Sequence, residues 1–167
     1  DRVYMNDYGD DSIVILDASD GSFIDKIIED ENLVDYFSYS FGVGVDNDGN
    51  VLGVDKFGNR IVRFTSGGEF IDRFGTRGYL AGQLYYPTSA DVDDQGNIYV
   101  AEDTNNRVSI FTSNLEPLSP FGSTGTGNGH FTTPEGVAIN SAGEIFVSDY
   151  GRTDVQKFAF TGTDYQI

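Results

Sequence analysis

Short stretches of alternating residues, separated by glycine-rich turns, recur along the whole chain. In residues 97–102, Ile98 and Val100 fall on one side of an extended strand, and Tyr99 and Ala101 fall on the other. This period of two is typical of β-strands, and no stretch shows the 3.6-residue apolar period of a helix. The pattern predicts an all-β chain with many turns, which 21 glycines, 10 tyrosines and 13 phenylalanines also favour.

The same pattern returns along the chain at a constant spacing. Gly49, Gly96 and Gly143 are 47 residues apart. The same offset aligns Phe64 with Phe111 and Phe158, Pro87 with Pro134, Phe74-Gly75 with Phe121-Gly122, and Asn59-Arg60 with Asn106-Arg107. The opening segment joins the series after one gap, matching Asp7, Ile13, Leu16, Phe23 and Leu33 to Asp55, Ile61, Phe64, Phe70 and Leu80. The chain is therefore a repeat protein.

Each repeat holds four short strands, here called a to d in chain order. In the third repeat, the pattern predicts strands over residues 89–93, 97–102, 107–112 and 115–121. Four strands of about five residues in a repeat of about 45 are typical of one β-propeller blade. The turns Asp48-Gly49 and Gln95-Gly96 suit tight hairpins between strands a and b, because glycine tolerates a positive φ.

Three stretches carry a more specific resemblance. Residues 97–111 (NIYVAEDTNNRVSIF), 134–140 (PEGVAIN) and 68–75 (GEFIDRFG) resemble the NHL repeat. The resemblance covers essentially the whole chain and is weakest over residues 1–40, where Ser40 replaces the usual proline. It implies an all-β propeller with four-stranded antiparallel blades. Propellers of this family most often have six blades, and their functions are mixed.

The length predicts an incomplete ring. We expect one NHL-type propeller segment over residues 1–167, with blades at about 1–40, 41–87, 88–134 and 135–167, or about three and a half blades. The first blade would begin at strand b, and the last would end near strand c with a short strand d at 163–167. Because Asp1 is not an initiator methionine, we expect a processed or truncated piece. Further blades of the same chain or a partner subunit would then cover the open ends. A closed four-bladed ring is the alternative.

Aromatic residues gather on the loops that would share one rim of the propeller, namely those joining strand b to c and strand d to a. Such loops on a rigid scaffold usually carry binding, and tyrosine suits contacts with protein or glycan. The alternative is that several of these rings pack between blades. The predicted binding residues are Tyr8, Phe57, Tyr79, Tyr85, Tyr150 and Arg152, and the same loops also carry Tyr36, Tyr39 and Tyr86.

An acidic residue closes strand b in every repeat, as Asp7, Asp55, Glu102 and Asp149. Arg60 and Arg107 follow five residues later, whereas the first and last repeats have Ser12 and Asp154 there. An acid that recurs in every blade is expected to cap a turn or to pair with the arginine rather than to do chemistry.

Candidate metal and catalytic residues are few. The stretch Asp91–Glu102 mimics a calcium loop in its acidic positions, but the other repeats lack these acids and no helices flank it. His130 is the single histidine and there is no cysteine, so no histidine cluster, thiolate site or catalytic triad can be placed. The sequence predicts no catalytic residue, metal ligand or cofactor. Calcium stays open, because acid-lined axial ends of propellers can bind it.

The charge narrows the choice of partners. The chain has 27 acidic and 10 basic residues, a formal net charge of -17, which disfavours nucleic acid. No apolar run approaches the roughly 20 residues of a membrane span. We expect a non-catalytic binding or scaffolding module that contacts protein or glycan, in an extracellular, cell-surface or periplasmic protein. The alternatives are a calcium-dependent hydrolase or lactonase of the gluconolactonase type and an RNA-binding propeller like those of TRIM-NHL proteins.

Overall fold

Fifteen short strands, joined by hairpin turns, account for all the regular structure in the described residues of the computed structural model, which are 1–28 and 40–167. They form one three-stranded sheet and three four-stranded sheets. The first sheet contains β1 (Arg2–Asp7), β2 (Ser12–Asp17) and β3 (Phe23–Ile27). The second contains β4 (Ser40–Val45), β5 (Val51–Asp55), β6 (Arg60–Phe64) and β7 (Phe70–Phe74). The third contains β8 (Pro87–Val92), β9 (Ile98–Glu102), β10 (Arg107–Phe111) and β11 (Pro117–Phe121). The fourth contains β12 (Pro134–Ile139), β13 (Ile145–Asp149), β14 (Asp154–Phe160) and β15 (Tyr165–Gln166).

Every sheet is an antiparallel meander, in which each strand pairs with the next one along the chain. The all-β prediction is therefore confirmed. In the third repeat the strands begin and end within two residues of the predicted limits. None of the described residues forms a helix with the length and apolar character needed to cross a membrane.

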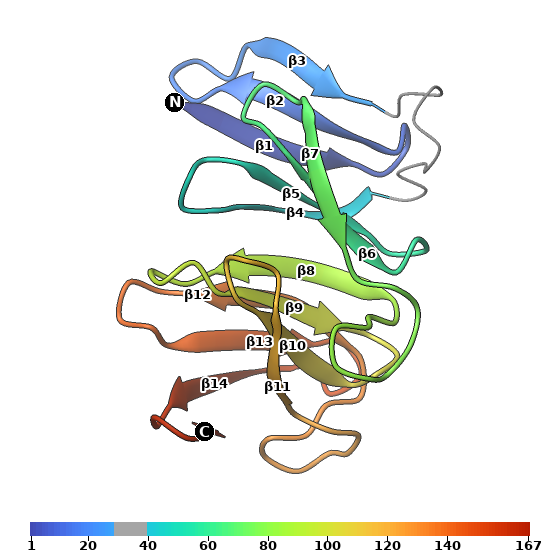
Figure 1. The fold of residues 1–167 in the computed structure, drawn as a ribbon, viewed down its shortest axis with the longest axis vertical. Coiled ribbons are helices and arrows are strands. Elements are labelled where there is room, and N and C mark those ends of the chain that lie inside the picture. Colours follow the sequence, from blue (N-terminus) through green and yellow to red (C-terminus); the bar gives the residue numbers. More distant parts are fainter. Residues whose placement is uncertain (29–39) are drawn as a thin grey trace.

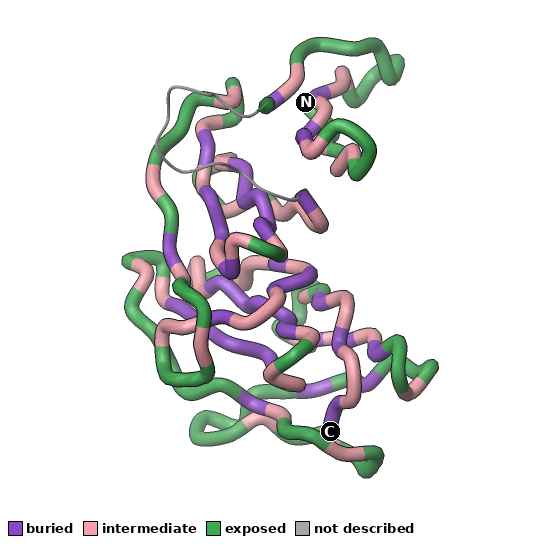
Figure 2. The backbone as a smooth tube through the Cα atoms, turned by 90° about the vertical axis from the view of Figure 1, so that its right-hand side faces the viewer, coloured by how far each residue is buried: buried purple, intermediate pink, exposed green. Residues whose placement is uncertain are grey.

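The four sheets, called blades 1 to 4 below, stand side by side along an arc (Figure 1). In the perpendicular view the backbone follows a curve, with the N-terminus near one end and the C-terminus near the other (Figure 2). Blades 1 and 4 therefore lie far apart, and the chain does not close a four-bladed ring by itself. The arrangement is that of an incomplete propeller.

Apolar residues fill the spaces between neighbouring blades. Between blades 2 and 3, Leu52, Val54 and Ile61 pack against Ile98, Val100 and Phe111. Tyr99, Ala101 and Val108 point the other way, into a second cluster with Ile145, Val147 and Phe158 of blade 4. The alternation read from residues 97–102 thus serves two different interfaces, because successive side chains of a strand point to opposite faces of its sheet.

The innermost strands approach each other too closely for side chains at some positions. A Cβ added to Gly44 on β4 would lie 2.5 Å from the carbonyl oxygen of Ala90 on β8. One repeat later, Asp91 stands at the position of Gly44, and its Oδ2 accepts a hydrogen bond of 2.7 Å from the Ile139 amide of β12. Contacts of the inner strands therefore set the spacing between blades.

The loops that join one blade to the next are closed by a buried side chain. Leu84 and Phe131 lie at equivalent positions and are fully buried. Gly75 and Gly122 come directly after strand d with φ values of 91° and 88°, and a Cβ there would lie 2.6 Å from Leu84 and 2.3 Å from Phe131. The repeated Phe-Gly pair marks this turn, because only glycine fits both the positive φ and the close contact.

We predict that Gly44→Ala destabilises the protein by about 1–3 kcal/mol, because the added methyl group meets backbone that side-chain rotation cannot move away. Thermal and urea unfolding measure the change. Gly9→Ala is the matched control, since its Cβ would meet only Asp7 Oδ1 at an ordinary 3.5 Å. Equal stability of the two variants would contradict the close approach of β4 and β8.

The short strand β15 covers the outer end of the cluster between blades 3 and 4. The Tyr165 ring stacks on Phe121 at a centroid distance of 4.5 Å. Its hydroxyl lies 3.1 Å from that of Tyr99, which donates a hydrogen bond of 3.2 Å to Asp93. Burial raises the pKa of Tyr99 far above its usual value, with further increases from Tyr165 and Asp93.

This raised pKa predicts alkaline destabilisation. Between the unfolded pKa of about 10 and the higher folded pKa, the unfolded chain binds fewer protons at Tyr99, so stability falls as the pH rises. We expect the urea midpoint to fall less between pH 9 and pH 11 in Tyr99→Phe than in the wild type. Exposed Tyr79→Phe is the control for general alkaline effects, and the absorbance of tyrosinate reports ionisation directly. An identical pH dependence in both variants would rule out Tyr99 as the cause.

Candidate binding rim

The loops that join strand b to c and strand d to a lie at one end of the sheets, on the right in Figure 1. We call this end the rim. Its b–c loops cover residues 8–11, 56–59, 103–106 and 150–153, and its described d–a loops cover residues 75–86 and 122–133. Tyr36 and Tyr39 of the predicted rim lie outside the described residues.

The b–c turns share one backbone conformation. The residue before strand c has a positive φ in every blade, at Asp11 (49°), Asn59 (57°), Asn106 (51°) and Thr153 (57°). Asparagine and aspartate tolerate this left-handed conformation, whereas it strains the β-branched Thr153. Because the four turns are alike, the residues on their tips occupy equivalent places along the rim.

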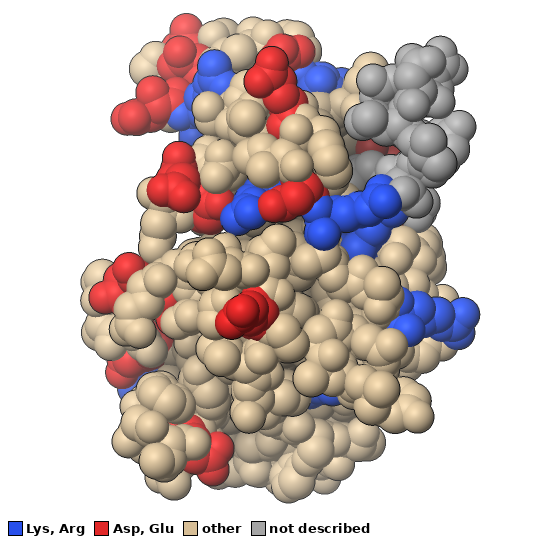
Figure 3. Space-filling view, in the orientation of Figure 1, with Lys and Arg blue, Asp and Glu red and all other residues tan. Residues whose placement is uncertain are grey.

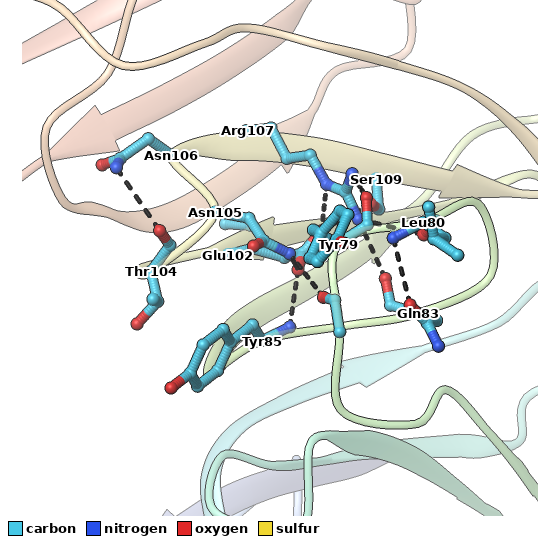
Figure 4. Close-up of polar contacts among 12 residues, drawn as sticks. Tyr79, Leu80, Gln83, Tyr85, Glu102, Thr104, Asn105, Asn106, Arg107 and Ser109 are labelled. Carbon is cyan, nitrogen blue, oxygen red and sulfur yellow. Dashed lines mark hydrogen bonds and ion pairs between the residues drawn. The ribbon is translucent and has the colours of Figure 1, made fainter.

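Each turn is built around the acidic residue that closes strand b. The side chains of Asp55, Glu102 and Asp149 are almost completely buried. Glu102 Oε1 accepts hydrogen bonds from Arg107 Nε (2.7 Å) and Ser109 Oγ (2.5 Å). Glu102 Oε2 accepts from the Tyr85 amide at 2.7 Å and from Asn105 Nδ2 at 2.5 Å (Figure 4). The buried carboxylate therefore holds both its own turn and the end of the d–a loop.

The corresponding carboxylates of blades 2 and 4 have similar partners. Asp55 accepts from Arg60 Nε and from the Gly58 amide, both at 2.8 Å. Asp149 accepts a hydrogen bond of 2.7 Å from the amide of Thr132. Thr132 stands 47 residues after Tyr85, at the equivalent position of the next repeat. Asp7 of blade 1 accepts from the Gly9 amide at 3.0 Å. These bonds are those of turn-capping groups.

Arg107 also ties down the preceding d–a loop. Its guanidinium donates to the carbonyl oxygens of Tyr79 (2.7 Å) and Gln83 (2.9 Å), as Figure 4 shows. Together, Glu102 and Arg107 connect a b–c turn to positions 17 to 28 residues earlier in the chain. The hydrogen bonds from Arg107 therefore hold the backbone that carries Tyr79 in place.

In blade 4, different residues hold the preceding d–a loop in place. Asp154 and Gln156 stand where blade 3 has Arg107 and Ser109. Gln156 Nε2 donates to the His130 carbonyl at 2.9 Å, and Gln156 Oε1 accepts from the Gly129 amide at 2.9 Å. Sequence reasoning missed Gln156, although the simultaneous change at both positions of the repeat was a usable signal.

Arg152 completes this arrangement, with only 11% of its side chain exposed. It donates to the Gly127 carbonyl at 2.6 Å and to Asp154 Oδ2 at 2.7 Å. The hydrogen bond from Arg152 lowers the pKa of Asp154 and raises that of Arg152. Arg152, which the sequence analysis predicts to be a binding residue, is therefore engaged in hydrogen bonds that support a loop.

His130 is exposed, and its Nδ1 atom lies 2.9 Å from Ser123 Oγ.

Three of the rim aromatics form one continuous group, which we call the aromatic ledge: Phe57, Tyr86 and Tyr85. The ring centroids of Phe57 and Tyr86 are 5.4 Å apart, and those of Tyr86 and Tyr85 are 5.1 Å apart. The Tyr86 backbone has a φ of 53°, and its amide donates a hydrogen bond of 3.0 Å to Asn59 Oδ1. The ledge thus joins a loop of blade 2 to the entry of blade 3.

Arg77 flanks the ledge, and Lys56 lies on the b–c loop of blade 2. Arg77 lies over the Tyr85 ring at 4.8 Å and donates a hydrogen bond of 2.7 Å to its hydroxyl. Lys56 lies 4.2 Å from the Phe41 ring centroid and 3.1 Å from Asp103 Oδ2. In the space-filling view, Lys and Arg side chains stand out on the rim side, whereas many of the visible Asp and Glu lie toward the opposite side (Figure 3).

The other predicted aromatics lie apart from the ledge. Tyr79 is exposed at the tip of a d–a loop, while Tyr8 and Tyr150 are exposed on the b–c turns of the two end blades. Next to Tyr150, a pocket of about 430 Å³ is lined by Glu135, Ser148, Asp149, Tyr150, Thr153, Asp154 and Val155. The rim therefore presents a fixed aromatic centre and single tyrosines at both ends.

The acids of the calcium-like stretch point to separate partners. Asp91 accepts from Ile139, Asp93 accepts from the amides of Gln95 and Asn97, and Glu102 is held by Arg107. Among the described residues, no three His, Asp or Glu side chains converge on one point that could hold a metal ion. These residues therefore do not fit a calcium cage.

Radially arranged antiparallel sheets with functional loops on one rim define the β-propeller class. Within this class, the family model of the NHL repeat matches residues 84–111 and 131–158, and the resemblance to the NHL repeat is thus confirmed. No curated protein matches the sequence significantly.

Solved structures of β-propeller proteins share the fold at low sequence identity. A streptogramin B lyase matches with 17% identity and a TM-score of 0.68, over 93% of this chain and 46% of the other. A catalytically inactive virginiamycin B lyase from Staphylococcus aureus, crystallised with quinupristin, matches with 16% identity and a TM-score of 0.71, over 99% of this chain and 50% of the other. A 6-phosphogluconolactonase-like protein from Bacteroides uniformis matches with 14% identity and a TM-score of 0.67, over 99% and 54%. The chain spans about half the length of these structures, which include enzymes of more than one kind.

We predict that Glu102→Gln destabilises the protein by about 3 kcal/mol, because it leaves Arg107 without its buried counter-charge. The rim loop should loosen as well, with faster amide hydrogen exchange at Tyr85 than in the wild type. Exposed Glu116→Gln should leave both stability and exchange unchanged. A similar, small effect of both substitutions would show that the buried carboxylate does not hold the loop.

Proposed function

We propose that this propeller segment is a non-catalytic module that binds protein or glycan through the rim, within an extracellular, cell-surface or periplasmic protein. The observation that carries the proposal is the aromatic ledge. Its rings are held by backbone and side-chain bonds that are already formed in the free protein. A rigid aromatic surface loses little conformational entropy on binding.

The chemistry of the ledge suits such partners. Phe57 offers an apolar face, while Tyr85 and Tyr86 offer apolar faces with hydroxyl groups at their edges. Arg77 adds a cationic group beside the Tyr85 ring, so polar or acidic groups of a sugar or a protein can be accommodated. The exposed Tyr79, Tyr8 and Tyr150 would extend the contact along the rim.

Catalysis has less support in the described residues. The buried carboxylates of Glu102 and Asp149 are engaged in structural hydrogen bonds, and His130 contacts a serine at an exposed loop. The lyases and the lactonase-like protein among the similar structures share the fold at under 20% identity, and a fold alone does not carry a function.

The test compares two sets of variants on a glycan array and against immobilised extracellular proteins. We expect Phe57→Ala, Tyr79→Ala and Tyr85→Ala each to weaken binding at least about 10-fold, as central aromatic residues of interfaces do. Leu118→Ala, an exposed apolar residue on the outer strand β11, should bind like the wild type. Undiminished binding by all three rim variants, with thermal unfolding unchanged, would refute the rim as the binding surface.

A further inference from the structure

The central residue of the aromatic ledge, Tyr86, has an uncommon backbone conformation. Its φ of 53° lies in the left-handed region, which a bulky residue rarely adopts because its Cβ atom crowds the neighbouring backbone. Residues persist in this region where surrounding contacts impose it, and such residues gather at functional sites. Contacts with the rest of the molecule therefore have to hold Tyr86 in this conformation.

The next repeat provides an internal reference. Thr133 stands 47 residues after Tyr86, and a proline follows each of them. Tyr86 has a positive φ, whereas Thr133 does not. Because the following proline is common to both positions, it does not cause the difference.

The two residues share one backbone contact and differ in the other. Both carbonyl oxygens accept a hydrogen bond from the residue that follows the acid of strand b, at 3.1 Å for Tyr86 and 3.0 Å for Thr133. The Thr133 amide donates to Asp149, the acid of its own blade, at 2.9 Å. The Tyr86 amide donates instead to Asn59 of the preceding blade. The amide of Tyr86 is thus turned toward blade 2.

Asn59 engages two of the three ledge residues at once. Its Oδ1 atom accepts from the Tyr86 amide at 3.0 Å, and its Nδ2 atom donates to the Phe57 carbonyl oxygen at 2.7 Å. Only 6% of Asn59 is exposed, so little water competes for these bonds. Phe57 and Tyr86 are also the residues whose rings make the contact between blades 2 and 3. One buried amide group therefore connects the two sides of the ledge.

The equivalent asparagine of blade 3 makes no such connection. Asn106 has nearly the same turn conformation as Asn59, with φ values of 51° and 57°. Its Nδ2 atom contacts Thr124 Oγ1 at 3.2 Å and the Thr104 carbonyl oxygen at 3.5 Å. Its Oδ1 atom is buried and has no hydrogen-bond partner within the part of the chain that the structure describes. The same residue in the same turn thus holds the start of the next blade only between blades 2 and 3.

We propose that Asn59 is a positioning residue that assembles the aromatic ledge in the conformation that binds. The proposal rests on the proposed function, in which the ledge contacts the partner. With Asn59 in place, the Tyr86 ring lies between those of Phe57 and Tyr85, at centroid distances of 5.4 Å and 5.1 Å. A partner then meets three rings as one surface that is formed before binding, which lowers the entropy lost on association.

The alternative conformation is the one that Thr133 shows. Without the Asn59 acceptor, nothing offsets the strain of the positive φ. Tyr86 then adopts an ordinary φ, and its amide turns toward the acid of its own blade, as that of Thr133 does. The Tyr86 ring moves away from Phe57, and the ledge separates into single aromatic residues. Asn59 therefore sets the balance between an assembled and a separated ledge.

Asn59→Gly tests the proposal, because glycine keeps the positive φ of the turn without strain and removes only the side-chain hydrogen bonds. By NMR, we expect loss of the nuclear Overhauser effects between the Phe57 and Tyr86 rings. The effect between the amide and α protons of Tyr86, which is strong at positive φ, should weaken. Asn106→Gly, the matched control in the next repeat, should change neither signal. Asn59→Asp should keep the positive φ of Tyr86, since it keeps the Oδ1 acceptor and since Asp11 has this turn conformation in blade 1 (φ 49°).

Binding of these variants is measured on the same glycan array and immobilised extracellular proteins. Asn59→Gly should weaken, by at least about 10-fold, every interaction that Phe57→Ala weakens, whereas Asn106→Gly should bind like the wild type. Ring contacts that survive in Asn59→Gly would overturn the proposal, whatever the array shows. Ring contacts that are lost while binding persists would instead refute the ledge as the binding surface, so the two failures are distinguishable. Thermal unfolding verifies that the variants are folded.

Discussion

The structure depends on one constraint: both faces of each four-stranded sheet are apolar, and both must be covered. Ile98 and Val100 on β9 pack toward blade 2, whereas Tyr99 and Ala101 on the same strand pack toward blade 4. A blade with two such faces cannot be stable alone, but a row of similar blades covers every internal face. The arc and the repeat follow from this requirement, and it leaves the outer faces of blades 1 and 4 exposed.

A second requirement acts at the rim, where a buried carboxylate must be satisfied in each turn. A buried ion pair contributes little net stability, but a buried charge without partners is costly. In blade 3, Arg107 and Ser109 satisfy Glu102. In blade 4, the amides of Thr132 and Thr133 satisfy Asp149, and Gln156 and Arg152 bind the loop. Since the turn tolerates this exchange, the rim loops can vary in sequence without losing their positions.

The structural features that meet these two requirements differ in how well the sequence predicts them. Alternation is visible within a single strand, and the 47-residue offset is visible by aligning the chain with itself. Together they predicted the strands and the turn acids, of which Asp55 and Glu102 are examples. The ledge depends on Asn59 of blade 2, which accepts a hydrogen bond from the Tyr86 amide. Arg152 donates a hydrogen bond to Gly127, 25 residues earlier in the chain. Contacts between different blades leave no spacing rule in the sequence, so the role of Arg152 required coordinates. For Gln156, the only signal in the sequence was the change of residue type at two positions of the repeat.

Exposed apolar groups on this molecule therefore have two different meanings. On the ledge, the Tyr85 hydroxyl and the Arg77 guanidinium keep the aromatic surface partly hydrated, which suits a surface that binds and releases a partner. Val3, Met5 and Val155 lie on the outer faces of blades 1 and 4, at positions that are buried in blades 2 and 3, although Ser148 and Lys157 share the face of Val155. A surface of the second kind resembles a core cut in half, as permanent interfaces do. Contacts made by the ledge and contacts made by the outer faces of blades 1 and 4 should accordingly differ in lifetime.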